Sequence, residues 1–311
     1  MTEVTIGIDI SKDHLDAHRL PGGEHERFDN TSSGHKALLR WIGSAPARIV
    51  YEPTGPYHRN LEVRLATSGM PIVKVNPRQA RRFAQAVGGL AKTDALDAAM
   101  LARMGAVLGL EARPVRDATL NILKDLHLAR AALVKDRTAA KNRAKMITLA
   151  LLKQHNAARL KQIDQQLAAI DAAIAAQISA DPTLAARMAI LVSIPGIGAV
   201  TAAMLVVEMP ELGGLDSKAA AALAGLAPIT RQSGQWKGKS FVQGGRKQVR
   251  QALYMPALVA MRFNPDMKAK YKQLTSTGKA PKQAITAIMR KLIVLANALL
   301  KKALPWQPKL S

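Results

Sequence analysis

Residues 4–10 read Val-Thr-Ile-Gly-Ile-Asp-Ile, and this stretch decides the fold of the first third of the chain. Its apolar residues are typical of a buried β-strand. Asp9, near the end of the run, is the exception, because packing alone does not explain a carboxylate there. The segment therefore predicts a strand that presents an acidic side chain at its end.

Strand and helix signals alternate through residues 1–110, and Pro21-Gly22-Gly23 marks a turn between two hairpin strands. Three strands followed by alternating helix and strand predict a mixed sheet with helices packed on it, and so an α/β domain. Strands are expected at residues 5–10, 15–20, 25–29, 48–51 and 71–75, and helices at residues 33–42, 57–68, 77–86 and 93–108.

Three more carboxylates stand where a metal site could use them. Glu52 follows another short apolar run in Tyr-Glu-Pro-Thr-Gly, and Asp94 and Asp97 lie three residues apart at the start of a helix. The helical pair shares a face, and strand ends could place Asp9 and Glu52 side by side. Mg²⁺ prefers hard oxygen ligands and neutralises charge developing on phosphate. The four residues therefore predict a magnesium site for phosphoryl chemistry.

An ordinary interpretation of the helical pair stays open, because Thr93 is a helix cap and acidic residues favour the first turn. Two other aspartates near Asp9, Asp13 and Asp16, are assigned to solvent. The seven histidines show no metal-ligand spacing. Those near the acidic segments, which we expect at the surface, are His14, His18 and His58.

The charge of the chain indicates a polyanionic partner. The 311 residues include 45 Lys and Arg against 22 Asp and Glu, which gives a net charge of +23. A field of this sign favours DNA or RNA. The net charge is +3 in residues 1–110, +6 in residues 111–190 and +14 in residues 191–311. We thus expect metal chemistry in the first domain, and we expect the last domain to make many of the contacts with the phosphate backbone.

No cysteine is present, so disulfides and cysteine-based zinc sites are excluded. The chain reads directly into a strand, and charges interrupt its apolar stretches before about 18 residues. We therefore expect a soluble intracellular protein that is not associated with a membrane.

The middle segment, residues 111–190, predicts long amphipathic helices. Residues 117–180 contain neither Gly nor Pro, and leucine and isoleucine recur at steps of three and four. A narrow apolar stripe of this length favours a helical hairpin or coiled coil that serves as a dimerisation arm. A plain bundle within one subunit remains the alternative.

The last segment, residues 191–311, begins with a turn that resembles a helix-hairpin-helix. In Ile194-Pro195-Gly196-Ile197-Gly198, the glycines Gly196 and Gly198 would let backbone amides approach a phosphate at the start of the next helix. A tight interhelical turn without a ligand is the alternative.

A loop rich in cations follows and contains Ser233 before Gly234. A serine there could be a phosphate ligand or a nucleophile, although an ordinary loop serine is the simpler interpretation of the residues alone. Gly244-Gly245 leads into a basic helix that could cradle phosphate. The cations expected to bind nucleic acid in these two segments are Arg231, Lys237, Lys239, Arg246, Lys247 and Arg250.

These motifs, in this order, resemble those of the IS110 family of insertion-sequence transposases, which are DEDD recombinases related to Piv-type invertases. The motifs are Gly-Ile-Asp-Ile-Ser-Lys, Tyr-Glu-Pro-Thr-Gly, Lys-Thr-Asp-Ala-Leu-Asp-Ala, Ile-Pro-Gly-Ile-Gly and Arg-Gln-Ser-Gly. The resemblance covers essentially the whole chain, and Glu-Pro-Thr-Gly is similar to the IS1111 branch. It implies a RuvC-like, RNase H-type N-terminal domain, a coiled-coil middle and a mostly helical C-terminal transposase domain.

The resemblance also implies roles for individual residues and partners. Asp9, Glu52, Asp94 and Asp97 would take the DEDD positions that bind Mg²⁺, and Ser233 would attack DNA to form a covalent phosphoserine link. A structured bridge RNA would pair with donor and target DNA. The protein would act in the cytoplasm of a bacterium, in association with the nucleoid. Dimers would assemble into a tetramer, in which the DEDD domain of one subunit meets the serine domain of another.

Two other functions remain open at the level of sequence. One is a RuvC or RNase H-type nuclease, which would cut with metal-activated water and would not need Ser233. The other is a non-catalytic nucleic-acid-binding protein, which would depend on neither Mg²⁺ nor the carboxylates.

Overall fold

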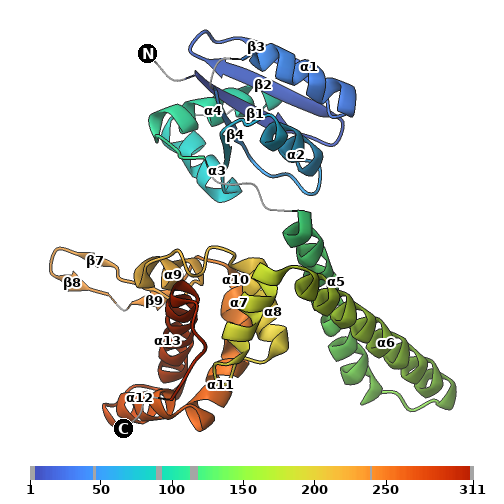
Figure 1. Cartoon of the computed structure of the whole chain (residues 1–311), viewed down its shortest axis with the longest axis vertical. Helices are drawn as coiled ribbons and strands as arrows, with labels where there is room; N and C mark the ends of the chain where they lie inside the picture. The colour runs from blue at the N-terminus through green and yellow to red at the C-terminus, as the bar shows by residue number, and fades with distance from the viewer. Residues whose placement is uncertain (1–3, 45–46, 89–92, 113–117, 239, 309–311) are drawn as a thin grey trace. The chain divides into compact units, whose positions relative to one another are not determined.

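The computed structural model of the chain describes residues 4–44, 47–88, 93–112, 118–238 and 240–308. The chain forms two compact units, Met1–Arg116 and Asp117–Ser311 (Figure 1). Each unit has its own hydrophobic core, so each is described by itself.

The first unit is a five-stranded mixed sheet of order β3-β2-β1-β4-β5. The central strand β1 is antiparallel to β2 and parallel to β4, which confirms the predicted mixed sheet with packed helices. The strands are β1 Val4–Ile10, β2 His14–Leu20, β3 His25–Asp29, β4 Ala47–Tyr51 and β5 Ile72–Lys74. The helices are α1 Ser32–Ile42, α2 Arg59–Thr67, α3 Pro77–Ala86 and α4 Asp94–Val107.

Each face of this sheet is covered by two helices, and β1 divides its residues between the faces. Ile6, Ile8 and Ile10 pack with residues of α1 and α2, because alternate residues of a strand point the same way. The other residues of β1, which include Gly7 and Asp9, lie on the face that α4 covers. The alternation therefore separates the apolar core from the acidic side chain.

Gly7 explains how α4 reaches the sheet. A Cβ atom at this position would overlap the carbonyl oxygen of Ala98 and the amide nitrogen of Ala102, both in the backbone of α4. Only glycine permits so close an approach. The contact sets the depth of α4 and, with it, the position of Asp94 and Asp97 on its first turn.

We expect Gly7→Ala to destabilise the first unit by about 2–3 kcal/mol or more, since backbone atoms must move to admit the methyl group. Thermal unfolding measures this effect. Gly69→Ala is the matched control, because nothing lies within 4 Å of its added Cβ and only its positive φ of 71° opposes the change. Equal losses in the two variants would contradict the close-approach argument.

The second unit is mostly helical and carries two short two-stranded sheets. Its helices are α5 Ala118–Ala144, α6 Ala150–Ala180, α7 Pro182–Val192, α8 Ala199–Glu208, α9 Ser217–Leu223, α10 Lys247–Ala252, α11 Tyr254–Phe263, α12 Pro265–Ser276 and α13 Pro281–Lys302. Its strands are β6 Pro228–Ile229, β7 Gln232–Ser233, β8 Trp236–Lys237 and β9 Phe241–Val242.

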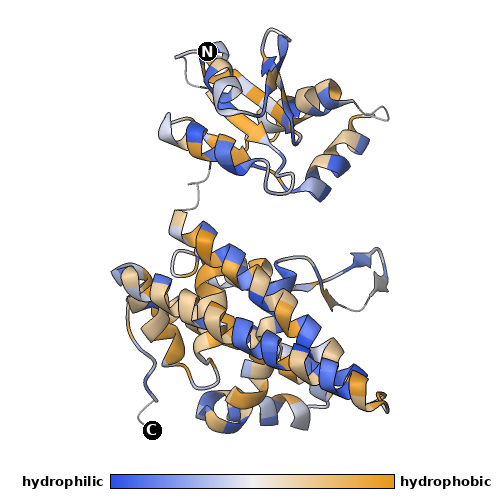
Figure 2. Ribbon diagram, turned by 90° about the vertical axis from the view of Figure 1, so that its right-hand side faces the viewer, coloured by the Kyte–Doolittle hydropathy of each residue, from blue (hydrophilic) through white to orange (hydrophobic). Residues whose placement is uncertain are grey.

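The helices α5 and α6 pack against each other as a hairpin (Figure 1). Arg130 on α5 pairs with Asp171 on α6, with 2.6 Å between Nε and Oδ1. Both helices contribute to the core of the second unit, through residues such as Leu123 and Ile178. In Figure 2, polar and apolar residues mix along the hairpin. Its tip exposes apolar side chains at Met146, Leu149, Leu151 and Leu152.

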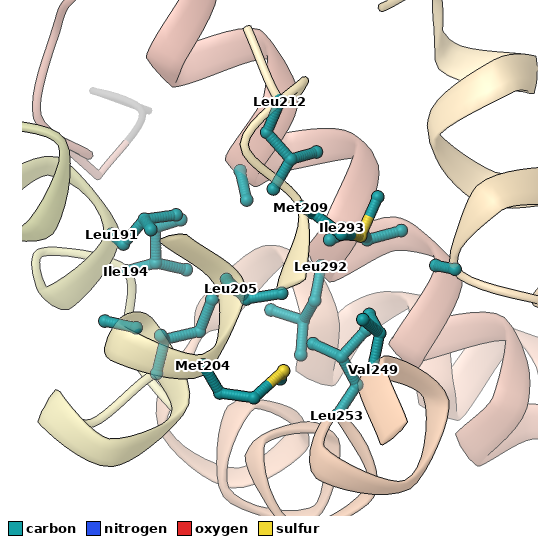
Figure 3. Close-up of a cluster of buried hydrophobic side chains, with 14 of the residues drawn as sticks. Leu191, Ile194, Met204, Leu205, Met209, Leu212, Val249, Leu253, Leu292 and Ile293 are labelled. Carbon is teal, nitrogen blue, oxygen red and sulfur yellow. The ribbon is translucent and has the colours of Figure 1, made fainter. Parts of the chain in front are cut away.

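The core of the second unit gathers α7, α8, α10, α11 and α13 around a shared cluster of side chains (Figure 3). The cluster includes Leu205 from α8, Val249 from α10 and Leu292 from α13. α13 is also long and apolar enough to cross a membrane. The core helix of a globular domain can be equally apolar, and α13 buries eight residues here, so packing explains its composition.

Candidate catalytic site

The sheet topology brings the predicted carboxylates of three segments toward one edge. Ile8 of β1 lies beside Tyr51 of the parallel strand β4, so Asp9 and Glu52 follow at the same end of adjacent strands. α4 begins on the same face, with Asp94 and Asp97 in its first turn. Thr93 caps this helix by accepting a hydrogen bond from Leu96, so the helix-cap interpretation holds together with the clustering.

The electrostatics of Asp9 support this convergence. The pKa of its carboxyl is raised to about 6, first by burial and then by the negative charges of nearby carboxylates. In order of effect these are Asp97, Asp94, Asp16 and Glu52. All four predicted acidic residues therefore belong to one electrostatic cluster, and Asp16 joins them.

The assignment of Asp16 to solvent is wrong. Asp16 is 3% exposed and lies directly opposite Asp9 in the sheet. Its carboxylate accepts hydrogen bonds from Nε of Arg27, at 3.1 and 3.2 Å, and lies 3.1 Å from Nε2 of His25. The register of the hairpin places Arg27 of β3 opposite Asp16 of β2. The sequence could have indicated this pair only through a charged residue at the matching position of each strand. Asp13 is exposed, as expected.

The donor set fits a hard divalent cation. The four predicted side chains supply carboxylate oxygens, and burial followed by repulsion from the neighbouring carboxylates raises the pKa of Asp9. Within the described ranges, no three His, Asp or Glu side chains are gathered closely enough to hold a metal ion. The four carboxylates therefore lie in the same region, but their oxygens are too far apart to coordinate one ion. The side chains would have to move toward one another when a metal ion binds.

A buried polar network supports the loop that follows Glu52. Glu62 of α2 accepts a hydrogen bond of 2.7 Å from Nζ of Lys74 and lies 3.5 Å from Nε2 of His58. The side chain of His58 is only 13% exposed, so the expectation of a surface position is wrong. Burial lowers its pKa, as does the charge of Lys74. Tyr51, which precedes Glu52, is fully buried beside this network.

Ser233 lies in the second unit, on a β-ribbon rather than in an irregular loop. We call residues 228–242 the serine arm. In this arm β6 pairs with β9, and β7 pairs with β8 so that Ser233 faces Trp236 across a two-residue turn. Gly234, with φ of +55°, begins that turn, a conformation that favours glycine. Ser233 is exposed, so its hydroxyl is accessible to a phosphate.

Two of the predicted phosphate ligands have hydrogen-bond partners within the chain. Both terminal nitrogens of Arg246 donate to Glu211, at 2.7 and 2.6 Å. Arg250 donates to the carbonyl oxygens of Gly225 and Gly244 and so fastens the Gly-Gly segment. Arg231 and Lys247 are exposed. For Lys237 only the backbone in β8 is described, and Lys239 lies outside the described residues.

The Pro-Gly-Ile-Gly segment lies between the helices α7 and α8, as the sequence predicts. Gly196 has φ of +107°, and a Cβ there would lie 2.7 Å from the carbonyl oxygen of Pro256 and 2.9 Å from Ala260 Cβ. Packing against α11 therefore accounts for Gly196. Gly198 is exposed at the start of α8 with open space around it, so it is the glycine of the pair that a phosphate could approach.

Comparison with known proteins agrees with this assembly. A model of the IS110-type DEDD transposase domain matches residues 6–156, and one described as the transposase IS116/IS110/IS902 family matches residues 188–272. Pilin gene-inverting proteins of Moraxella bovis and Moraxella lacunata are each 30% identical over 100% of this chain and 99% of their own length. An uncharacterized 43.6 kDa protein of insertion element IS110 from Streptomyces coelicolor is 31% identical over 50% of this chain and 38% of its own.

These matches show that the chain, with an α/β unit that gathers carboxylates and a basic helical unit, is a DNA recombinase of the transposase class. The chain belongs to the IS110 family of insertion-sequence transposases. Membership in a DEDD family implies the use of a divalent metal ion, generally Mg²⁺.

We expect Asp9→Asn to stabilise the first unit in metal-free buffer by about 1 kcal/mol at neutral pH, since solvent screening reduces the full effect of a half-buried charge. The pKa of Asp9 is raised from 3.8 to about 6, so its ionisation costs stability. The cost grows as pH rises from about 4 to about 6, and then stays constant. Thermal unfolding at several pH values measures the difference.

The gain should disappear below about pH 4, where the aspartic acid is protonated in both states. A wild-type protein more stable than the variant near neutral pH would contradict the conclusion that ionisation of Asp9 costs stability.

Proposed function

We propose that this transposase is an RNA-guided, Mg²⁺-dependent recombinase that exchanges DNA strands through a phosphoserine intermediate. The observation that carries the metal assignment is the placement of Asp9 and Glu52 at the same end of two adjacent strands, with Asp94 and Asp97 in the first turn of the helix that covers this face. The pKa of Asp9 agrees with it, since burial and then the charges of the neighbouring carboxylates raise it. Three segments separated in sequence supply these carboxylates to one edge of the sheet. The mixed sheet with α4 across one face supports an RNase H-like fold for this unit.

Asp9, Glu52, Asp94 and Asp97 would hold the metal through their carboxylate oxygens. Mg²⁺ would neutralise negative charge that develops on the scissile phosphate. The chain's own contribution is to fix the strand ends and the first turn of α4, so that these oxygens face one phosphate.

Ser233 would act as the nucleophile. A bond forms between its Oγ and the phosphorus of DNA, while one bridging P–O bond breaks and the departing sugar oxygen takes up a proton in place of the one that the serine loses. A sugar hydroxyl of another strand then attacks the phosphoserine, restores the diester and releases the serine. Exposure of Ser233 at the end of the serine arm supports this role.

Nucleic acid would be held mainly by exposed cations of the second unit. Arg231 and Lys247 are exposed, and Lys237 and Lys239 lie in the same basic segments of the sequence. Gly198 would present a backbone amide to phosphate at the start of α8. Arg246 and Arg250 would contribute by shaping this surface through their contacts to Glu211 and the Gly-Gly segment.

The proposed partners are donor DNA, target DNA and a structured bridge RNA. The helical hairpin of α5 and α6 would mediate dimerisation, and its exposed apolar tip supports such a contact. Dimers would assemble into a tetramer in which the carboxylates of one subunit act with the serine of another. Family membership leaves the water-using nuclease as the alternative to test, because it would share the carboxylates and not need Ser233.

We expect Ser233→Ala to abolish the covalent protein–DNA adduct and recombination, because alanine lacks a nucleophilic oxygen. Migration of labelled DNA with denatured protein measures the adduct. Ser240→Ala is the control, since this serine is also exposed on the arm and contacts Thr230. Cleavage that persists in Ser233→Ala would favour the water-using nuclease instead.

We expect Asp9→Asn to reduce recombination by about 100-fold or more, because a lost metal ligand removes several kcal/mol of transition-state stabilisation. Nucleic-acid binding, measured by gel shift, should remain close to wild type. Asp13→Asn is the matched control, since Asp13 is exposed nearby. Full activity of Asp9→Asn would overturn the metal-site assignment.

A further inference from the structure

Arg27 connects two carboxylates that come from different elements. Its Nη2 atom lies 3.0 Å from Oδ2 of Asp16 on β2 and donates a hydrogen bond of 3.2 Å to Oδ2 of Asp94 on α4. Its Nε atom donates to both oxygens of Asp16. One guanidinium therefore fastens the first turn of α4 to the sheet.

The two ends of this bridge have different environments. The side chain of Asp16 is 4% exposed, and a carboxylate so buried requires a cation close to it. Asp94 is 57% exposed, at the start of α4. Asp16 is thus the fixed end, since the sheet register holds it opposite Arg27, and Asp94 is the end that would otherwise move.

Asp9, Asp16 and Arg27 form a row across three neighbouring strands. Asp9 lies opposite Asp16, and Asp16 lies opposite Arg27, so all three side chains are on the same face of the sheet. α4 covers that face. The row leads from the metal-binding carboxylate of β1 to the cation that reaches Asp94.

We propose that Arg27 is a positioning residue, which ties Asp94 to the buried carboxylate of Asp16 and so holds it near Asp9 before a metal ion binds. The inference rests on the proposed metal site. Only Oδ2 of Asp94 is hydrogen-bonded to Arg27, so Oδ1 can serve as a metal ligand. Orienting contacts of this kind typically change metal affinity by about 10- to 100-fold when they are removed.

The two contacts of Arg27 should contribute differently to stability. The contact with the exposed Asp94 adds little, because water screens an exposed ion pair. Removal of Arg27 should nevertheless destabilise the first unit, since the buried carboxylate of Asp16 would keep His25 nearby but lose the arginine. Metal binding is therefore compared well below the unfolding temperature of each variant, where the loss of Arg27 releases Asp94. A high metal concentration should restore activity, because the bound ion itself would then hold the carboxylate.

The test uses the full-length protein and measures Mn²⁺ binding by the electron paramagnetic resonance signal of free Mn²⁺. We expect Arg27→Gln to weaken Mn²⁺ binding by about 10-fold. Arg27→Lys should give an intermediate loss, because lysine keeps the positive charge but lacks the planar guanidinium that contacts two carboxylates at once. The Mg²⁺ concentration for half-maximal recombination should rise similarly, with the rate at saturating Mg²⁺ close to wild type. Arg64→Gln, which removes an exposed arginine that contacts Ser32, is the matched control.

Unchanged or tighter Mn²⁺ binding in Arg27→Gln would overturn the proposal, and tighter binding would show that Arg27 competes with the metal. Hydrogen exchange adds a readout without metal, since amides of the first turn of α4 should exchange faster in Arg27→Gln. Unaltered exchange there would also count against it. Failure of the metal site itself looks different: wild type would bind no Mn²⁺, and Asp9→Asn would stay active.

Discussion

The close approach of α4 to β1 at Gly7 is the contact on which the candidate site depends. A side chain at that position would collide with the backbone of Ala98 and Ala102, and α4 would have to move away from the sheet. Asp94 and Asp97 occupy the first turn of the same helix, so their distance from Asp9 follows from this packing. The absence of a side chain at Gly7 thus allows carboxylates from two segments that are distant in sequence to lie close together.

Gathering these carboxylates has an electrostatic cost. Burial and four neighbouring negative charges oppose the ionisation of Asp9, as its raised pKa shows. Arg27 offsets part of this repulsion by contacting Asp16 and Asp94. A divalent cation would offset more of it, which gives a physical reason for a domain with little net charge in a strongly basic chain.

The second unit differs from the first in its core and in its charge. Its apolar helices supply a large core, and its few acidic residues include Glu211, which engages Arg246. The serine arm is built from short strands and a glycine turn, with Ser233 exposed. A rigid helical body with an accessible hydroxyl on a ribbon suits the proposed attack on a phosphate that another part of the assembly positions.

The sequence by itself determined the strands and helices of the first unit, because period-two and helical patterns record which face of each element is buried. It also determined that Asp9, Glu52 and the α4 pair are unusual for packing. Only the tertiary structure decided what surrounds them. Register places Asp16 and Arg27 beside Asp9, packing against α11 requires glycine at position 196, and Arg246 binds a carboxylate. These contacts join residues far apart in the chain, and local sequence patterns carry no record of such distances.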